Sequence, residues 1–357
     1  MTDQRYHRQL ILKGFGPEGQ QKLARARVLV VGAGGLGVPV LTYLNAMGVG
    51  TLGIVDADVV QASNLHRQVL YEADQVGQSK VRAAKARLGA QNPHTQIEAH
   101  PVQFTVHNAM ELLAGYDLVV DATDNFPTRY LINDACVLRR IPFVYGALHA
   151  FQGQVSVFNY KGGPTYRCLF PEMPGPDTVP DCNTHGVLGI LPGIIGNLQA
   201  LEAIKVITGL GQVLSGILLL YDALAQQTRQ MRFSKNPENV RIAELRPSYT
   251  FSCAAPVPSV TAKMLGELLK EGQPFVLDVR TEAEFRVGHI AGAKNIPLPR
   301  LKDGMHQLEG AREVYVICQS GARSLRAVQQ LSEAMPSTVF FQVEGGMNQY
   351  QPHDASH

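Results

Sequence analysis

Residues 27–37 of the chain read RVLVVGAGGLG, and this stretch decides the fold. It begins with a short apolar run, Val28–Val31, which is typical of a buried strand. The glycines that follow fit the pattern G-x-G-x-x-G, and a helix is predicted from Val38 to Ala46. A second strand, Thr51–Asp56, comes next. The stretch therefore predicts a strand, helix, strand unit of a parallel sheet that helices cover on both faces.

Later segments extend this unit into a Rossmann-like, doubly wound and mostly parallel sheet. The predicted elements are a basic helix at Lys80–Leu88, a strand at Tyr116–Asp121, a helix from Arg129 and a strand at Pro142–Tyr145. After Gly153 the strands Gln154–Tyr160 and Ile217–Tyr221 alternate in polarity, which predicts an antiparallel extension. A long Pro- and Gly-rich crossing, Gly162–Gly189, lies between them and is long enough to be functional.

A second, smaller α/β domain follows a polar segment punctuated by prolines. Its strands are predicted at Phe275–Val279 and Val314–Cys318. The segment before it suits an extended tether that lets the second domain swing. We therefore predict a first domain at residues 1–233, a linker at 234–258, a second domain at 259–352 and a tail at 353–357.

Composition excludes several classes of protein. The chain has 357 residues, of which 45% are hydrophobic and 17% charged, enough to bury a core in each of two domains. Its net charge is +2, with 32 basic and 30 acidic residues. Such a balance creates no broad electrostatic field, so neither nucleic acid nor a membrane surface is expected as the main partner.

The cysteines and the apolar segments indicate the compartment. An odd number of cysteines is spread thinly along the chain, which favours free thiols over a disulfide framework. The N-terminus, Met1–Tyr6, is polar, and the most apolar long stretch, Gly186–Gly209, is interrupted by Pro192. That stretch predicts a buried helix and not a membrane span. We expect a soluble, cytoplasmic protein.

The glycine pattern predicts a nucleotide site. Gly32, Gly34, Gly35 and Gly37 lie between a strand and a helix, where glycine lets the backbone approach a phosphate. Asp56 ends the next strand and is placed to accept a hydrogen bond from a ribose hydroxyl. Taken alone, these residues favour NAD over ATP.

Charged and polar residues that follow shift this interpretation towards ATP. They are Asp58, Asn64, Arg67, Gln68, Lys80 and Asp124. Arginine and lysine at the same strand-end crevice suit a ligand with more negative charge than NAD carries. Asp124, which follows a strand, is predicted to bind Mg²⁺.

With these motifs the chain resembles the MoeB/ThiF family, relatives of ubiquitin-activating enzymes, over Arg5–Arg232. Members adenylate the C-terminal glycine of a ubiquitin-like sulfur carrier. The resemblance implies Asp56 on the ribose, Asn64, Arg67 and Lys80 on the phosphates, and Asp124 on the metal. Arg8 matches a residue that members lend to the active site of the other subunit of a homodimer.

The chain departs from this family at a structural zinc site. Members often carry two C-x-x-C pairs that bind Zn²⁺ tetrahedrally. Here the first pair reads Thr165-Tyr166-Arg167-Cys168, and the second, within Asn236–Val240, has no cysteine. One thiol cannot supply four ligands. We therefore predict no structural zinc and interpret Cys168 as a small buried residue.

Two other cysteines are predicted to be reactive. Cys182 lies in the polar crossing, and by resemblance it occupies the position of the family's catalytic cysteine. Cys318 ends a strand and opens the loop Cys318–Ser324, which leads into a helix. Loop amides, the helix N-terminus and Arg323 are expected to favour the thiolate of Cys318.

The region from Val257 to Gln351 resembles a rhodanese domain. The shared motifs are Leu277–Arg280, Glu284-Phe285, Gly288–Ile290, Gly292-Ala293, Asn295–Pro297 and the C-x-x-G-x-R-S loop at Cys318. Rhodaneses hold a persulfide on that cysteine. The resemblance therefore implies that Cys318 carries sulfur.

Together the two modules predict one reaction sequence: adenylation of a carrier protein ending in Gly-Gly, then transfer of sulfur from Cys318 to form a thiocarboxylate, which Cys182 releases. A cysteine desulfurase or thiosulfate would supply the sulfur. Two alternatives remain open at this point: an NAD-dependent oxidoreductase with an appended rhodanese, and a carrier-protein scaffold without catalysis. The sequence leaves open which carrier is used, and whether its product is molybdopterin, thiamine, a thiolated tRNA or cysteine.

Overall fold

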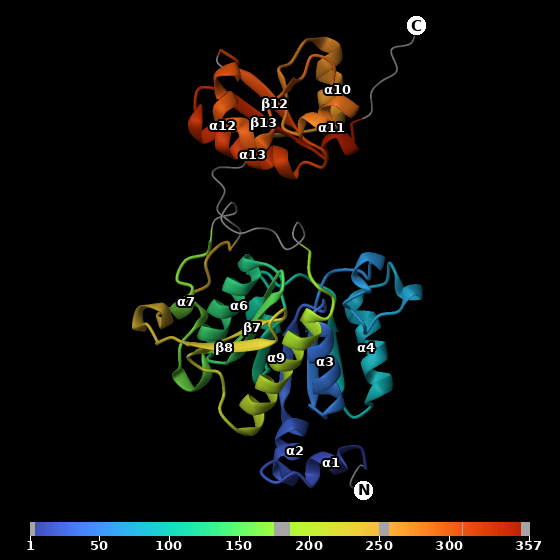
Figure 1. Ribbon diagram of the computed structural model, residues 1–357, viewed down its shortest axis with the longest axis vertical. Helices are drawn as coiled ribbons and strands as arrows, with labels where there is room; N and C mark the ends of the chain where they lie inside the picture. The colour runs from blue at the N-terminus through green and yellow to red at the C-terminus, as the bar shows by residue number, and fades with distance from the viewer. Residues whose placement is uncertain (1–3, 175–185, 250–256, 309, 351–357) are drawn as a thin grey trace. The chain divides into compact units, whose positions relative to one another are not determined.

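The computed structural model describes residues 4–174, 186–249, 257–308 and 310–350. Residue contacts divide the chain into two compact units, Met1–Phe251 and Ser252–His357. Each unit has a sheet of its own (Figure 1). No helix in the described part of the chain is both long enough and apolar enough to cross a lipid bilayer.

The first unit is built on an eight-stranded sheet in the order β3-β2-β1-β4-β5-β6-β7-β8. Strands β1 to β5 pair in parallel, and β6 to β8 add an antiparallel extension. This confirms the predicted fold class. The strands are β1 (Arg27–Val31), β2 (Thr51–Val55), β3 (Gln96–His100), β4 (Leu118–Asp121), β5 (Phe143–His149), β6 (Gln152–Phe158), β7 (Ile217–Asp222) and β8 (Gln227–Arg232).

Helices cover both faces of this sheet (Figure 1). Residues of α3, α4 and α9 form one apolar core with the sheet, and those of α5, α6 and α7 form the other. Strand β2 is buried along its whole length because helices cover both faces of the sheet. The helices are α1 (His7–Leu10), α2 (Gly16–Arg25), α3 (Gly37–Ala46), α4 (Lys80–Gln91), α5 (Ala109–Leu112), α6 (Phe126–Arg139), α7 (Tyr166–Leu169) and α9 (Leu191–Thr208).

The start of α6 differs from the sequence prediction. The helix begins at Phe126 and not at Arg129. The side chain of Asn125 accepts a hydrogen bond from the backbone N–H of Thr128 at 2.9 Å, and so caps the helix. Pro127 lies in the first turn, where its missing N–H is no loss. The cap brings Arg129 into the helix and turns it towards the sheet.

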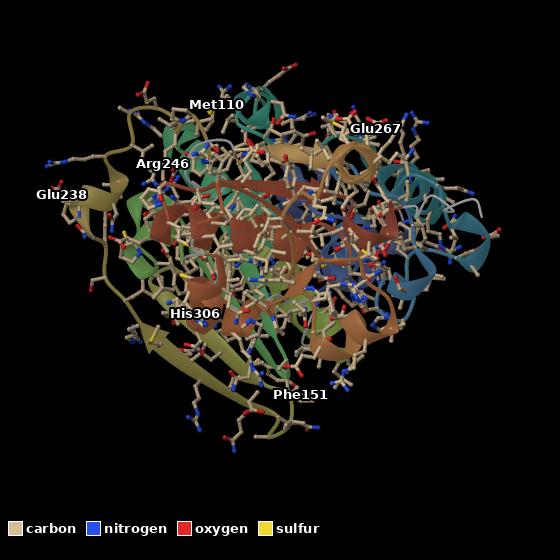
Figure 2. All side chains as sticks on the ribbon, turned by 90° about the horizontal axis from the view of Figure 1, so that it is seen from above. Met110, Phe151, Glu238, Arg246, Glu267 and His306 are labelled. Atoms are coloured by element: carbon tan, nitrogen blue, oxygen red, sulfur yellow. The ribbon has the colours of Figure 1, made fainter. Side chains whose placement is uncertain are left out.

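The segment after β8, predicted as the linker, contacts the first unit. The hydroxyl of Tyr249 donates a hydrogen bond to Asp134 Oδ2 at 2.7 Å, and the Tyr249 side chain is buried. Arg167 binds the other oxygen of Asp134 at 2.7 Å. Glu238 and Arg246, labelled in Figure 2, are exposed on the same segment. Tyr249 thus ties the end of this segment to the first unit.

The second unit has a five-stranded sheet in the order β11-β10-β12-β13-β9, with every pairing parallel. Apolar residues on the two faces of the sheet form two cores. The strands are β9 (Ser259–Thr261), β10 (Val276–Asp278), β11 (Lys294–Asn295), β12 (Glu313–Ile317) and β13 (Val339–Glu344). The helices are α10 (Ala262–Glu271), α11 (Glu282–Val287), α12 (Leu301–Gly304) and α13 (Ala322–Ala334).

Candidate functional site

A cavity of about 880 Å³ opens at the carboxyl ends of β1, β2 and β4. The strand order changes direction between β1 and β4, which is where doubly wound sheets bind their ligands. Most of the residues predicted for the nucleotide site line this cavity. They are Gly32, Gly34, Gly35, Asp56, Asp58, Asn64, Arg67, Gln68, Lys80 and Asp124.

The glycines of the loop differ in what they do. Gly32 has a φ of +100°, and a Cβ at this position would lie 2.6 Å from the carbonyl oxygen of Ala122. Gly37 does not line the cavity; a Cβ there would collide with the carbonyl of Gly32. Gly34 and Gly35 face the cavity itself. The first and last glycines therefore shape the turn, and the middle two leave the backbone open to a ligand.

Asp56 braces the glycine loop. One carboxylate oxygen accepts a hydrogen bond from the N–H of Ala33 at 2.8 Å, and the other accepts one from the N–H of Asp58 at 2.8 Å. Each oxygen has a second lone pair, so the carboxylate can still accept a hydroxyl from a ligand. The sequence predicted that Asp56 accepts a ligand hydroxyl, but it did not predict that Asp56 bonds the glycine loop.

Lys80 and Arg67 are both held by polar neighbours. Lys80 Nζ lies 2.8 Å from Asp58 Oδ2; the lysine side chain is 6% exposed, whereas that of Asp58 is 71% exposed. Asn64 Oδ1 accepts hydrogen bonds from Arg67 at 3.1 Å and from Gln68 at 3.0 Å. The other side-chain oxygen of this group, Gln68 Oε1, is buried without a partner in the described structure. These contacts fix a cluster of donors against the cavity wall.

Asp124 is exposed and lines the cavity. Among the described residues, no side chain or backbone group bonds its carboxylate, and no three His, Cys, Asp or Glu side chains gather to form a complete metal site. Mg²⁺ is commonly held by one or two carboxylates together with the phosphates of its substrate. A single open carboxylate beside this cluster of donors therefore fits Mg²⁺.

A buried ion pair in the cavity wall was not predicted from the sequence. Arg129 Nε lies 3.1 Å from Asp121 Oδ2, and both side chains are nearly inaccessible to solvent. The guanidinium also lies over the ring of Tyr145, 4.9 Å from its centre. Burial by itself lowers the pKa of Arg129, but Tyr145 and Asp121 outweigh it and raise that pKa above its ordinary value. The available signal was the separation of eight residues between Asp121, the last residue of β4, and Arg129 in the following helix.

Arg8 lies away from the cavity of its own chain. It is exposed on α1, and Tyr6, just before that helix, bonds Asn92 at 2.8 Å. The same Tyr6 packs against Gly48, near the amino-terminal end of β2, whereas the cavity lies at the carboxyl ends of the strands. Arg8 is not among the residues that line the cavity.

The four positions that correspond to the zinc pairs are brought together by hydrogen bonds. Cys168 Sγ accepts the N–H of Asn236 at 3.3 Å, and Thr165 Oγ1 donates to the carbonyl of Asn239 at 3.2 Å. Asn239 Nδ2 donates to the carbonyl of Arg167 at 2.8 Å. Cys168 is half-buried, so its prediction as a buried residue is wrong; its sulfur instead faces the exposed backbone of Asn236.

The structure describes one of the two cysteines that were predicted to be reactive. Cys182 lies outside the described residues. Cys318 follows β12 directly and is buried, and its sulfur accepts the N–H of Gly321 at 3.1 Å. Ser324 Oγ lies 3.6 Å from the same sulfur, at the start of α13. The loop thus presents a backbone amide and a helix N-terminus to Cys318, as the sequence predicted.

Arg323 is not a free cation beside this sulfur. Its two terminal nitrogens lie 2.8 and 2.7 Å from the two carboxylate oxygens of Glu284, at the start of α11. Hydrogen bonds from Arg323 hold the pKa of Glu284 well below its usual range. The C-terminal motif therefore contains a paired carboxylate that the sequence analysis did not place at the site.

Comparison with family models matches residues 6–242 to the ThiF family and residues 261–353 to the rhodanese-like domain. The first match spans more than half of the chain. This chain belongs to the ThiF family.

Two relatives of this ThiF-family chain match more than nine tenths of its length, and a third matches about two thirds of it. "Adenylyltransferase and sulfurtransferase MOCS3" of Drosophila sechellia is 40% identical over 370 residues, which cover 96% of this chain and 82% of that protein. "Probable adenylyltransferase/sulfurtransferase MoeZ" of Mycobacterium tuberculosis is 42% identical and covers 92% of this chain and 88% of its own length. "Sulfur carrier protein adenylyltransferase" of Thermus thermophilus is 56% identical over 65% of this chain and 88% of its own length.

Solved structures support the fold alone. The crystal structure of Escherichia coli MccB with MccA-N7isoASN matches with a TM-score of 0.60 at 21% identity, over 66% of this chain and 73% of that chain.

The ThiF-family chain is an adenylyltransferase and a sulfurtransferase, which confirms the predicted activities. The two alternatives, an oxidoreductase and a scaffold without catalysis, are excluded on the same grounds.

Proposed function

We propose that the chain activates the C-terminal glycine of a ubiquitin-like sulfur carrier protein ending in Gly-Gly and converts it to a thiocarboxylate. One observation carries the proposal: the glycine loop, Arg67, Lys80 and Asp124 line one cavity at the switch point of the sheet. The name of the Thermus thermophilus relative, which specifies a sulfur carrier protein, supports this choice of substrate.

ATP is the proposed nucleotide. In the first step a glycine carboxylate oxygen attacks the α-phosphorus, the bond to the bridging oxygen breaks, and pyrophosphate leaves. Asp56 would accept the ribose hydroxyl, and the donors of Asn64, Arg67, Gln68 and Lys80 would face the phosphates. Positioned donors of this kind stabilise charge that develops in the transition state.

Asp124 is the proposed ligand of Mg²⁺. Its open carboxylate supplies the hard oxygen that this ion prefers. When bound, Mg²⁺ would neutralise charge on the phosphate oxygens. The role of the chain is to hold Asp124 in the turn between β4 and α6, where it is exposed next to Asn125, the residue that caps α6.

A homodimer is proposed on the position of Arg8. Because Arg8 does not line its own cavity, a catalytic contact requires the cavity of a second copy. This agrees with the role that the family resemblance implies for the residue.

No structural zinc is expected. The positions that would supply four thiolates provide one, and hydrogen bonds among Thr165, Cys168, Asn236 and Asn239 already join the two segments. Elemental analysis of protein purified without added metal should find far less than one zinc per chain. A stoichiometric zinc that resists chelators would overturn this expectation.

Cys318 is the proposed sulfur carrier. Its persulfide sulfur attacks the acyl carbon, AMP leaves, and the carrier becomes joined to Cys318 through an acyl disulfide. The thiolate of Cys182 then attacks Cys318 Sγ, a disulfide forms between the two cysteines, and the thiocarboxylate leaves. A reductant must cleave that disulfide before the next turnover. We place this chemistry in the cytoplasm, where thiols stay reduced; all three cysteines in the described residues are free.

Pyrophosphate exchange tests the activation step. Purified chain, ATP and a candidate carrier should exchange labelled pyrophosphate into ATP. The matched control is the same carrier without its last two glycines, which should give background exchange. Equal exchange with the truncated carrier would remove the C-terminal glycine from the proposal. Mass spectrometry of the full-length carrier after addition of a sulfur donor should then detect the thiocarboxylate.

A further inference from the structure

Two arginines lie near Cys318, and each forms an ion pair with a carboxylate. Arg280 is buried and binds Asp278 through Nε at 3.0 Å and through Nη2 at 2.7 Å. Its remaining terminal nitrogen donates to Gln319, the residue after Cys318, at 3.1 Å. Arg323 binds Glu284 with both terminal nitrogens. Both guanidinium charges beside the loop are therefore compensated within the protein.

Arg323 lies within electrostatic reach of the Cys318 sulfur. Its pKa is raised first by the hydrogen bond to Glu284, while burial lowers it and the negative charges of Glu284 and then Cys318 raise it further. Both side chains of the pair are about one third exposed, at 34% and 33%, so an incoming anion can meet them. The net charge that such an anion meets depends on Glu284.

Thr281 also holds the carboxylate of Glu284 in place. Its Oε2 accepts the N–H of Thr281 at 3.0 Å and the hydroxyl of Thr281 at 2.8 Å, in a capping box that starts α11. The carboxylate is thus fixed before any sulfur donor arrives. Arg323 has no other acceptor among the bonds that the described residues make.

Sulfur donors differ in the charge that they bring to this loop. Thiosulfate is a dianion, and when Cys318 Sγ takes its outer sulfur, the S–S bond breaks and sulfite leaves as a dianion. A deprotonated alkyl persulfide carries one charge at the reacting sulfurs. Its S–S bond breaks in the same way, and a thiolate leaves. Both reactions give the same Cys318 persulfide without net oxidation, but the dianion needs more positive charge nearby.

We propose that Glu284 determines the donor selectivity of Cys318: by compensating Arg323, it makes the loop favour a singly charged alkyl persulfide over thiosulfate. This rests on the proposed role of Cys318 as the sulfur carrier. Glu284 acts through Arg323 and does not itself touch the reacting sulfurs.

The test measures how fast each donor loads Cys318 in the full-length chain. Thiosulfate and the persulfide of 2-mercaptoethanol are the two probes. Samples are quenched with an alkylating agent, and the peptide that contains Cys318 is analysed by mass spectrometry. In the unaltered chain the alkyl persulfide should load faster. Equal loading by thiosulfate would overturn the proposal.

Glu284→Gln keeps the size of the side chain and an acceptor for Thr281 but removes the charge. It should raise the thiosulfate loading rate by about tenfold at low salt, while the alkyl persulfide rate changes by less than about twofold. A purely structural role would slow both donors together. An unchanged ratio of the two rates, or an equal change in both, would contradict the proposal.

The matched control is Glu282→Gln on the same helix, because Glu282 pairs with Arg300 at 2.9 Å and not with Arg323. It should leave the ratio unchanged; the same shift in this variant would reduce the effect to a general change of charge. When Arg323→Gln is combined with Glu284→Gln, the increase in the thiosulfate loading rate should disappear. Cys318→Ala separates the two levels by a second readout, the release of sulfite from thiosulfate. Release that continues in this variant overturns the sulfur-carrier role itself, whereas loss of that release together with an unmoved ratio in Glu284→Gln overturns only the role of Glu284.

Discussion

The nucleotide cavity and the Cys318 loop both lie at the carboxyl ends of parallel strands, but they differ in how far their charged groups are exposed and paired. In the cavity, Asp124 is exposed without a bonding partner among the described residues, and Asp58 is 71% exposed beside Lys80. In the loop, the sulfur is buried and Arg323 is paired with a carboxylate. An open site with an exposed, unbonded carboxylate suits the proposed nucleotide and its metal, whereas a loop with paired charges suits the proposed transfer of one sulfur.

The largest expected effect would separate the two regions completely. Asp124→Ala should reduce carrier-dependent pyrophosphate exchange by about 10²-fold or more, because the proposed ligand of Mg²⁺ is lost. Sulfur loading of Cys318 should stay unchanged. Cys318→Ala should show the reverse pattern, with normal exchange and no loading, so that the carrier stalls as its adenylate.

Each of these variants is the control for the other. If Asp124→Ala exchanged pyrophosphate at the normal rate, Asp124 would have no part in activation. If it also lost sulfur loading, the two regions would not be chemically independent.

A second test asks whether the cavity is complete within one chain. Arg8→Ala should lose exchange as Asp124→Ala does. Mixing the two inactive proteins should restore part of the activity, since a mixed dimer would contain one cavity with both residues intact. Native mass spectrometry would establish that subunits have exchanged. Absence of recovery in such mixed dimers would argue against a shared site.

A third test concerns the step that links the two regions. Cys182→Ala should leave both adenylation and Cys318 loading intact but slow the release of thiocarboxylated carrier. Carrier joined to Cys318 should accumulate, and a thiol reductant should free it. Intact mass spectrometry without added reductant would detect the joined species. A normal yield of thiocarboxylate under those conditions would leave Cys182 without a role.

The smallest expected effect concerns stability and not chemistry. Tyr249→Phe removes the hydroxyl that donates to Asp134, a buried carboxylate that Arg167 also binds. The free energy of unfolding of the first unit should fall by about 1 to 3 kcal/mol. Denaturant unfolding of the full chain measures it, with Tyr43→Phe as the control, because Tyr43 is 53% exposed. Equal losses in both variants would show that the bond to Asp134 contributes nothing.

Local patterns in the sequence were enough to predict much of the fold and of the site. An apolar strand, a glycine turn and a helix fixed the start of the sheet, and β1 and β2 lie within a residue of their predicted bounds. Asp56, Lys80 and Asp124 were assigned to one site because the carboxyl ends of parallel strands meet at one edge. The cavity contains all three. Such inferences need only periodicity and the known geometry of the unit.

What the tertiary structure alone decided are pairings between residues far apart in sequence. Arg323 and Glu284 are 39 residues apart, and Cys168 and Asn236 are 68 apart. The sequence identified each arginine and cysteine by type and neighbourhood, and so predicted Arg323 near the Cys318 thiolate without its partner Glu284, and a buried thiol at Cys168. Partners of this kind follow from how helices pack on a sheet, and periodicity carries no information about that packing. The sequence thus determined which groups each site has, and the packing determined which of their charges remain available.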